Sequence, residues 1–348
     1  MTINEVAAVA GVSRATVSKY MADADVYYVA EATRARIAAA IEELGYEPNA
    51  MARGLSNRRS KTIGVMVPSF LNPYYPSLMA GMSDVADEAG YTLVFGSSDD
   101  SAVREKQIIS SFRQRQVEGV LLAAVPKEAG ALSALVEADV EVVLVSRAAA
   151  HFAADTVLID DAGGMRSALD HLRGHGHSAI WHLAGPDQVG TFHNRAEAYR
   201  SYMDEQGVAE SSQGLVQADH ATMEGGERVA EAIFAEGSPT AIIAANDLLA
   251  LGVMNYCARV GKKVPEDLAV VGFDNVWVSR VPGVQLTTVD GRIREIGQMA
   301  ARRVLERILA RWDSDNGQSL PAKSVILPAD LVVRNTCGCG SGASQASQ

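Results

Sequence analysis

The sequence predicts a chain in two parts: a small α-helical helix-turn-helix unit, followed by a body of two α/β lobes, each a doubly wound parallel sheet. Three observations lead to this prediction. Two short helical patterns joined by a glycine begin the chain. From Thr62 onward, short apolar runs alternate with helix-length segments. The alternation forms two successive series, and because repeated strand–helix units imply a parallel sheet, two series imply two lobes.

Small and apolar residues at particular spacings predict the first helix and its turn. Val6, Val9 and Ala10 give the helix an apolar side. Gly11 suits a turn that needs a positive φ. Ser13 is placed to cap the second helix, because its hydroxyl can accept from early backbone N–H groups. The pattern therefore predicts two helices that cross closely over a short turn.

The second helix is predicted to present small and polar side chains to the outside. Val17 and Met21 face the core at i, i+4 spacing. In a helix-turn-helix unit, the first turn of this helix meets the base edges of DNA. A helical bundle without a nucleic-acid partner is the alternative for these residues taken alone. The candidate DNA contacts here are Thr2, Ser13, Arg14, Ala15, Thr16, Ser18 and Lys19.

The segment after the third helix favours DNA binding over a plain bundle. Ile37, Ile41 and Leu44 form the apolar stripe of that helix, and Gly45 ends it. Residues 48–62 then hold basic side chains and no acidic one. A very short helix with an internal glycine is unstable alone, so this segment is predicted to fold on DNA. Its candidate contacts are Asn49, Ala52, Arg53 and Leu55.

Charge is divided unevenly along the chain, whose net charge is −11. Residues 1–62 hold 8 Lys or Arg and 7 Asp or Glu, for +1, and the remainder holds 23 and 35, for −12. The body is therefore not expected to bind nucleic acid without the N-terminal unit. The sequence contains no apolar run near 18 residues and no signal peptide, which predicts a cytoplasmic protein with no membrane contact.

The apolar runs of the body are predicted to be buried parallel strands. The first series has runs at 63–67, 92–95, 120–123 and 142–145, with helices near 74–89, 102–117 and 128–137. The second series has runs at 179–183, 215–216, 241–244 and 269–271, with helices near 163–174, 193–206, 222–236 and 246–260. A late helix near 291–311 and a final run, 324–333, return the chain across both lobes.

Short motifs follow one another along the whole chain. Those of the N-terminal unit include Ala10-Gly11-Val12-Ser13, Ala15-Thr16-Val17-Ser18 and Ala52-Arg53-Gly54-Leu55. Those of the body include Asn72-Pro73-Tyr74-Tyr75, Ala245-Asn246-Asp247 and Gly272-Phe273-Asp274-Asn275. Together and in this order, the motifs resemble those of the LacI/GalR family of bacterial transcription regulators.

The resemblance implies a repressor whose homodimer binds a pseudo-palindromic double-stranded DNA operator. It also implies a periplasmic-binding-protein-like core, with a small-molecule effector between the lobes. Leu55 holds the position of the family's hinge leucine, which wedges into the minor groove and kinks the duplex. Lys19 stands where the family often has Arg, so the bidentate contact with guanine is either lost or replaced by a single point-charge contact. Whether the effector releases the protein from DNA or recruits it stays open. The choice between dimer and tetramer is also open, and the segment after Arg334 favours a dimer because it lacks the heptad leucines of a coiled coil.

Candidate effector residues follow the strand ends and the family positions. Tyr74 and Tyr75 follow the first strand, where an aromatic pair suits a sugar ring. The resemblance implies that Arg195, Asn246 and Asp274 hydrogen-bond the effector, and an Arg with a carboxylate suits vicinal hydroxyls. The second-tier candidates, near strand or loop ends, are Ser146, Arg147, Asp160 and His220.

The effector class and some residue roles have alternatives. Val189 stands where a purine-responsive relative has a cation, which favours a neutral sugar or polyol. Asp274 has a structural cap as its alternative role, and Arg195 a surface ion pair. Asp247 is expected to cap its helix rather than contact ligand.

No metal, cofactor or catalytic site is predicted. Cys257 is expected to be a buried small hydrophobe. Cys337 and Cys339 are expected to begin a disordered tail, with binding of a soft metal ion or oxidation as the alternatives. Four histidines cluster at 171–182, but no fourth ligand stands at a fitting spacing. The sequence contains no Walker loop, dinucleotide fingerprint, nucleophile elbow or convincing triad, which argues against an enzyme. The N-terminal unit and the missing signal peptide argue against a solute receptor for transport.

The predicted boundaries follow from these elements. They are 1–47 for the helix-turn-helix domain, 48–61 for the hinge, 62–335 for the core and 336–348 for a flexible tail. Within the core, the N-lobe is predicted at about 62–161 and 290–322, and the C-lobe at about 162–289 and 323–335.

Overall fold

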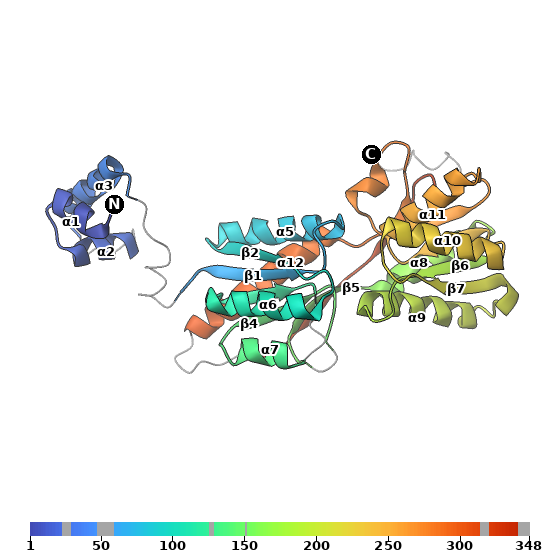
Figure 1. Cartoon of the computed structure of the whole chain (residues 1–348), viewed down its shortest axis with the longest axis horizontal. Coiled ribbons are helices and arrows are strands. Elements are labelled where there is room, and N and C mark those ends of the chain that lie inside the picture. The colour runs from blue at the N-terminus through green and yellow to red at the C-terminus, as the bar shows by residue number, and fades with distance from the viewer. Residues whose placement is uncertain (23–28, 47–58, 125–128, 150–151, 314–319, 340–348) are drawn as a thin grey trace. The chain divides into compact units, whose positions relative to one another are not determined.

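The computed structural model describes residues 1–22, 29–46, 59–124, 129–149, 152–313 and 320–339. The chain divides into two compact units, Met1–Lys61 and Thr62–Gln348 (Figure 1). Most of the predicted hinge, with Asn49, Ala52, Arg53 and Leu55, lies outside the described residues.

The first unit contains three helices, α1 (Ile3–Ala10), α2 (Arg14–Ala22) and α3 (Glu31–Leu44). Val6, Val17 and Ile37, one from each helix, are fully buried at its centre. Val9 was predicted on the apolar side of α1, but it is 49% exposed. The buried stripe of α1 runs through Val6, Ala7 and Ala10, and Val9 lies to one side of it.

Backbone conformation and capping confirm the predicted ends of these helices. Gly11 and Gly45 both adopt positive φ, at 64° and 54°, in the left-handed region that favours glycine. The Ser13 hydroxyl accepts from the Thr16 backbone N–H at 3.1 Å, as expected of a cap. Ala30, which precedes α3, makes no side-chain cap.

The first lobe of the second unit is built on a six-stranded sheet in the order β11-β5-β4-β3-β1-β2, with every neighbouring pair parallel. Its strands are β1 (Thr62–Val67), β2 (Thr92–Ser97), β3 (Gly119–Leu122), β4 (Glu141–Val145), β5 (Asp155–Ile159) and β11 (Ser324–Leu327). Its helices are α5 (Tyr74–Glu88), α6 (Ala102–Gln114), α7 (Ala129–Val136) and α12 (Ile293–Asp313).

The second lobe has a sheet in the order β12-β10-β9-β8-β6-β7, parallel except where β12 pairs antiparallel with β10. Its strands are β6 (Ile180–Ala184), β7 (Gln213–Gln217), β8 (Ala241–Ala244), β9 (Ala269–Asp274), β10 (Thr287–Asp290) and β12 (Asp330–Val332). Its helices are α8 (Asp161–Gly174), α9 (Gly190–Glu205), η1 (Glu210–Ser212), α10 (Met223–Glu236), α11 (Asp247–Arg259) and η2 (Trp277–Arg280).

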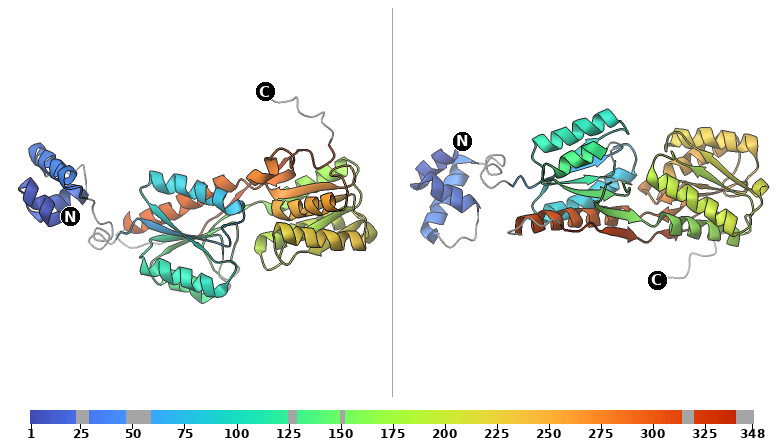
Figure 2. Two further views of the ribbon diagram at one scale, coloured as in Figure 1. Left: turned by 45° about the horizontal axis from the view of Figure 1, so that its top comes forward. Right: turned by 90° about the horizontal axis from the view of Figure 1, so that it is seen from below.

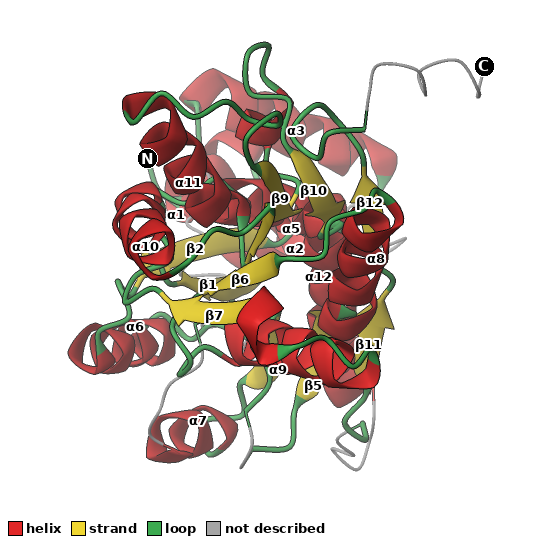
Figure 3. Ribbon diagram, turned by 90° about the vertical axis from the view of Figure 1, so that its right-hand side faces the viewer, coloured by secondary structure: helices red, strands yellow, loops and turns green. Residues whose placement is uncertain are grey.

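Helices cover both faces of each sheet, as doubly wound folds require (Figure 3). In the first lobe α5 and α12 cover one face, and α6 and α7 cover the other (Figure 2). A Cβ added at Gly81 of α5 would lie 2.1 Å from the Arg294 carbonyl oxygen, so the close approach of α5 and α12 requires glycine there. Within the described residues, no helix combines the length and apolar character needed to cross a bilayer.

The final strand segment is divided between the two sheets, which corrects two predictions. The run 324–333 was predicted as one element, and the C-lobe was predicted to resume at residue 323. Instead, β11 pairs with β5 in the first sheet, and only β12 joins the second. Pro328 lies between them and has no N–H to donate to a ladder. The predicted runs also omit β5 and β10, because β5 alternates in burial and β10 buries two threonines.

The predicted flexible tail is wrong at its beginning. Thr336 and Cys337 are buried. The Thr336 hydroxyl accepts from the Thr287 backbone N–H at 2.9 Å and donates to the Val270 carbonyl at 2.6 Å. Residues 340–348 lie outside the described part of the chain.

Candidate functional site

The outer face of α2 carries four of the eleven side chains predicted to meet DNA. Arg14, Ala15, Ser18 and Lys19 are exposed. Thr16 is half-buried and its hydroxyl lies 2.8 Å from that of Ser13, so these two residues also hold the start of the helix. The outer face therefore combines two cations with two small side chains, a set that can approach a duplex closely.

Thr2 has a structural role at the start of α1. Its side chain accepts from the Glu5 backbone N–H, and its backbone N–H donates to the Glu5 carboxylate at 2.6 Å. This reciprocal pair is a capping box, which stabilises the first turn of the helix. Thr2 remains exposed, so the cap leaves room for a phosphate contact.

A cavity of about 770 Å³ lies between residues of the two lobes of the second unit. Among the predicted effector residues, Tyr75, Arg147 and His220 line it, and so does Val189. Polar lining residues that the sequence analysis missed are Ser69, Asn72, Asp100, Glu105, Gln188, Asp219, Thr222 and Glu224. Asp100 and Gln188 lie a few residues beyond the ends of β2 and β6, so their position after parallel strands was a usable signal.

Arg147 and Tyr75 line this cavity, and Tyr74 packs against Tyr75. The Arg147 guanidinium lies 3.4 Å from the Tyr75 hydroxyl and 3.8 Å from the Asp100 carboxylate. The rings of Tyr74 and Tyr75 meet edge to face, with centroids 5.2 Å apart. The Tyr74 hydroxyl lies 2.5 Å from that of Ser146. Burial raises the pKa of both tyrosines, so both keep their protons and can donate.

Arg195 is held in a buried network rather than on the surface. Its Nε donates to Asp161 at 2.7 Å, and its Nη1 donates to the Ala245 carbonyl at 2.6 Å and to Asp274 at 3.3 Å. The guanidinium also lies 3.5 Å from the centre of the Phe273 ring. Arg195 is 4% exposed, so the alternative of a surface ion pair is wrong.

Asp274 ends β9 in a strained conformation, with φ of 108°. Burial raises its pKa to about 6, although Arg195 opposes the rise. Burial raises the pKa of Tyr74, and the negative charge of Asp274 raises it further. Tyr74 belongs to the first lobe, so the two lobes interact electrostatically at this point. The carboxylate accepts from Arg195, so it is not used as a helix cap. Strain, burial and a raised pKa mark Asp274 as a site candidate.

Two other predicted effector residues begin helices. The Asn246 side chain caps α11, accepting from the Leu249 N–H at 2.9 Å, and the Asp160 side chain caps α8, accepting from the Gly163 N–H at 2.9 Å. The prediction that Asp247 caps α11 is wrong. Its carboxylate instead accepts from the Val276 N–H at 2.8 Å and the Thr288 hydroxyl at 2.5 Å, and burial raises its pKa well above the usual value.

The predicted effector residues thus fall into distinct groups. Tyr75, Arg147 and His220 line the cavity. Arg195, Asp274 and the Tyr74–Ser146 pair form a buried polar cluster. Asp161, which the sequence analysis did not select, belongs to this cluster because it pairs with Arg195.

Comparison with protein families gives two matches along the chain. Residues 2–49 match the model described as bacterial regulatory proteins, lacI family. Residues 169–337 match the periplasmic binding protein-like domain. The first match covers the described helical unit, and the second covers most of the second lobe together with β11 and α12.

Individual proteins resemble the chain over nearly its whole length. The ribose operon repressor of Halalkalibacterium halodurans is 31% identical over 350 residues, covering 99% of both chains. A Lac repressor dimer bound to operator and the anti-inducer ONPF superposes with a TM-score of 0.84 at 26% identity, covering 97% of this chain and 99% of that one. A complex of the transcriptional regulator CelR with cellobiose gives a TM-score of 0.71 at 27% identity over the same shares.

Proposed function

Because this chain belongs to the LacI family of bacterial regulatory proteins, we propose that it is a repressor whose operator affinity is set by a sugar bound between its core lobes. The family is one of DNA-binding transcriptional regulators, not of enzymes. The observation that carries the proposal is that the chain combines an exposed α2 face with a large cavity between two α/β lobes, lined by both polar and apolar residues. We propose a cytoplasmic location, since the proposed partner is operator DNA.

For DNA reading, we propose that Arg14, Ala15 and Lys19 contact base edges. A homodimer would present two such helices to the half-sites of a pseudo-palindromic operator. The Lac repressor structure, a dimer bound to operator, supports this arrangement. The similarity to a protein named as the ribose operon repressor supports a repressor role. Asn49, Ala52, Arg53 and Leu55 remain proposed contacts on sequence grounds.

For the effector, we propose a neutral sugar that uses Tyr75, Arg147 and His220 from the cavity wall. Arg195 and Asp274 supply a donor fork and a carboxylate that suit neighbouring hydroxyls. The remaining proposed residues, Tyr74, Ser146, Asp160 and Asn246, support this site through the hydroxyl pair and the helix caps described above. The cellobiose complex of CelR supports the choice of a carbohydrate.

Operator selection tests the DNA-binding proposal. The full chain is incubated with random duplexes, and enriched sequences are titrated by fluorescence anisotropy at two salt concentrations. We expect a palindrome, with affinity that falls as salt rises. Lys19→Ala should weaken binding to it by about 1 kcal/mol or more and relax one base position. Arg36→Ala removes the same charge from the exposed side of α3 and serves as the control.

A sugar panel tests the effector proposal with the selected operator. One sugar should change operator affinity, and the direction of change shows whether it induces or corepresses. If purines act and sugars do not, the proposed ligand class is wrong. If no duplex is enriched with or without the panel, the regulator proposal itself fails. The sugar should be recovered unchanged, because no turnover is proposed.

A further inference from the structure

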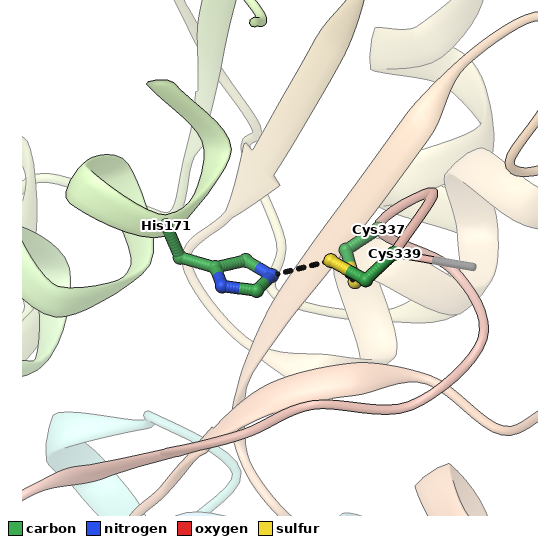
Figure 4. Close-up of side chains that lie close together, drawn as sticks. All are labelled: His171, Cys337 and Cys339. Carbon is green, nitrogen blue, oxygen red and sulfur yellow. Dashed lines mark hydrogen bonds between the residues drawn. The ribbon is translucent and has the colours of Figure 1, made fainter. Parts of the chain in front are cut away.

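Three soft or borderline donor atoms converge where the end of the described chain meets α8. The Cys339 sulfur lies 2.9 Å from Nε2 of His171 and 3.0 Å from the Cys337 sulfur. All three donor atoms lie within 4.8 Å of one another (Figure 4). Cys337 is fully buried, while His171 and Cys339 are partly buried. The cluster belongs to the second lobe and contains none of the proposed effector residues.

The backbone holds the two cysteines in this position. Thr336 is anchored to β9 and β10 by the bonds of its hydroxyl, and its carbonyl accepts from the Val270 N–H at 2.7 Å. Gly338 adopts φ of 78°, a conformation that side chains rarely tolerate, and this turn places both sulfurs on the same side. His171 comes from the last turn of α8, so both sides of the cluster rest on regular structure.

The donor set suits a soft or borderline metal ion. Zn²⁺ binds cysteine sulfur at about 2.3 Å and histidine nitrogen at about 2.0–2.1 Å in tetrahedral geometry. Such a centre separates two sulfurs by about 3.8 Å, so the donors need to move apart by less than about 1 Å. Three protein ligands leave the fourth position for solvent. Thiolate ligands select against Mg²⁺ and Ca²⁺, which prefer oxygen.

Metal binding requires deprotonated sulfurs and a neutral imidazole. A bound cation would therefore displace the thiol protons of the two cysteines, which are released to solvent.

We propose that His171, Cys337 and Cys339 form a binding site for one thiolate-preferring metal ion of the Zn²⁺ class. The ion would join the segment after β12 to α8, two parts of the chain separated by 168 residues. The chain crosses from the first lobe to the second between β11 and β12. The metal site would therefore hold the segment that follows this crossing against the second lobe. This inference does not depend on the effector or the operator.

Metal titration of the full chain tests the site. The protein is reduced, stripped with a chelator and titrated with Zn²⁺ against a coloured indicator, and with Co²⁺ while its visible absorption is recorded. We expect one equivalent per chain and a Co²⁺ spectrum of tetrahedral thiolate coordination. Loss of an outer-sphere partner costs roughly 10–100-fold in metal affinity, and loss of a ligand in Cys339→Ser or His171→Gln should cost at least as much.

Matched controls separate the site from general effects of the substitutions. Cys257→Ser changes a buried cysteine outside the cluster, and His193→Gln changes an exposed histidine that pairs with Asp187. Both should bind like the wild type. Circular dichroism of the stripped variants checks that they remain folded, and the metal should raise the melting temperature of the wild type but not of Cys339→Ser.

Several results would overturn the proposal. One is the absence of a stoichiometric site in the reduced protein. Another is equal binding by Cys339→Ser, His171→Gln and the two controls. A third is a mass showing that Cys337 and Cys339 remain joined as a disulfide after reduction, which would assign the pair to redox chemistry.

Discussion

Two buried clusters of arginine and aspartate side chains lie in different lobes of the core. One joins elements of the fold, and the other belongs to the proposed effector site. In the first lobe, Asp155 of β5 is fully buried and accepts from Arg303 through Nε at 2.9 Å and Nη2 at 2.5 Å. Its other oxygen accepts from the Lys323 backbone N–H at 2.7 Å and from Arg307 at 3.4 Å. This cluster joins α12 to β5 and to the residue that precedes β11.

In the second lobe, Arg195 faces two carboxylates, those of Asp161 and Asp274. Asp274 ends its strand with a strained backbone, and burial raises its pKa to about 6. Its field reaches Tyr74 of the opposite lobe. The contrast shows that burial of an ion pair does not by itself indicate function. Position at the carboxyl end of a parallel strand, together with backbone strain, distinguishes the proposed effector cluster from the one that supports the fold.

Asp155→Asn should have the largest effect, and that effect should be on stability. The substitution keeps the side-chain shape but leaves Arg303 and Arg307 short of a buried countercharge. Breaking a buried pair costs about 3–5 kcal/mol. Urea unfolding followed by circular dichroism measures this loss. Effector affinity of the folded fraction should be unchanged, and a loss of sugar binding at native stability would contradict the assignment.

Asp274→Asn should give the opposite pattern. Removing the charge-assisted acceptor should weaken sugar binding by about 1.5–3 kcal/mol, or roughly 10–100-fold. Stability at pH 8 should fall by less than about 1 kcal/mol or should rise, because the buried carboxylate is ionised there at a cost. Isothermal titration and urea unfolding of the same sample measure both quantities. A stability loss equal to that of Asp155→Asn would contradict the claim that Asp274 serves ligand binding while Asp155 serves the fold.

The pH dependence of sugar binding should follow the titration of Asp274. Its pKa is raised from 3.8 to about 6, so the carboxylate loses its charge as pH falls through 6. Affinity should be constant above this pH and fall by up to about tenfold per unit below it. Protonation favours the folded state, so this group adds stability as pH falls from 6 toward 3.8. Asp274→Asn should have a flat binding profile over this range, and an unchanged profile would assign the titration elsewhere.

Tyr74→Phe should have the smallest effect. It removes the hydroxyl that lies 2.5 Å from Ser146 and leaves the ring against Tyr75. The loss of one neutral hydrogen bond should cost about 1 kcal/mol in stability. Sugar affinity should fall less than in Asp274→Asn. A larger loss of sugar affinity would show that the hydroxyl contacts the ligand directly. Thermal unfolding without sugar measures the loss of stability, and the further stabilisation on adding sugar measures the loss of affinity.

The sequence predicted the parts of the fold that depend on local pattern. The left-handed turns at Gly11 and Gly45, the Ser13 cap and most strand and helix positions follow from short-range periodicity and capping chemistry. β5 and β10 were harder to predict from the sequence, because β5 begins with a buried aspartate and β10 contains two buried threonines. Burial of these polar residues depends on partners that are remote in sequence.

Part of the candidate site was also predictable. Arg195 and Asp274 were selected through the family resemblance, and both lie in the buried cluster. Their partner Asp161 was not selected, because nothing local separates it from the exposed Asp160 beside it. Asn246 caps α11 in place of Asp247, since the residue before a helix and the first residue within it are hard to distinguish without the backbone.

The sequence by itself determined the two-part organisation, the exposed α2 face and the alternation of strands and helices, because these depend on neighbours within a few residues. Only the tertiary structure decided which long-range partners meet. It divided the run 324–333 between two sheets, and it brought Cys337 and Cys339 to His171 although the intervening chain includes most of the second lobe. Such pairings depend on how whole elements pack, and spacing along the chain carries no information about them.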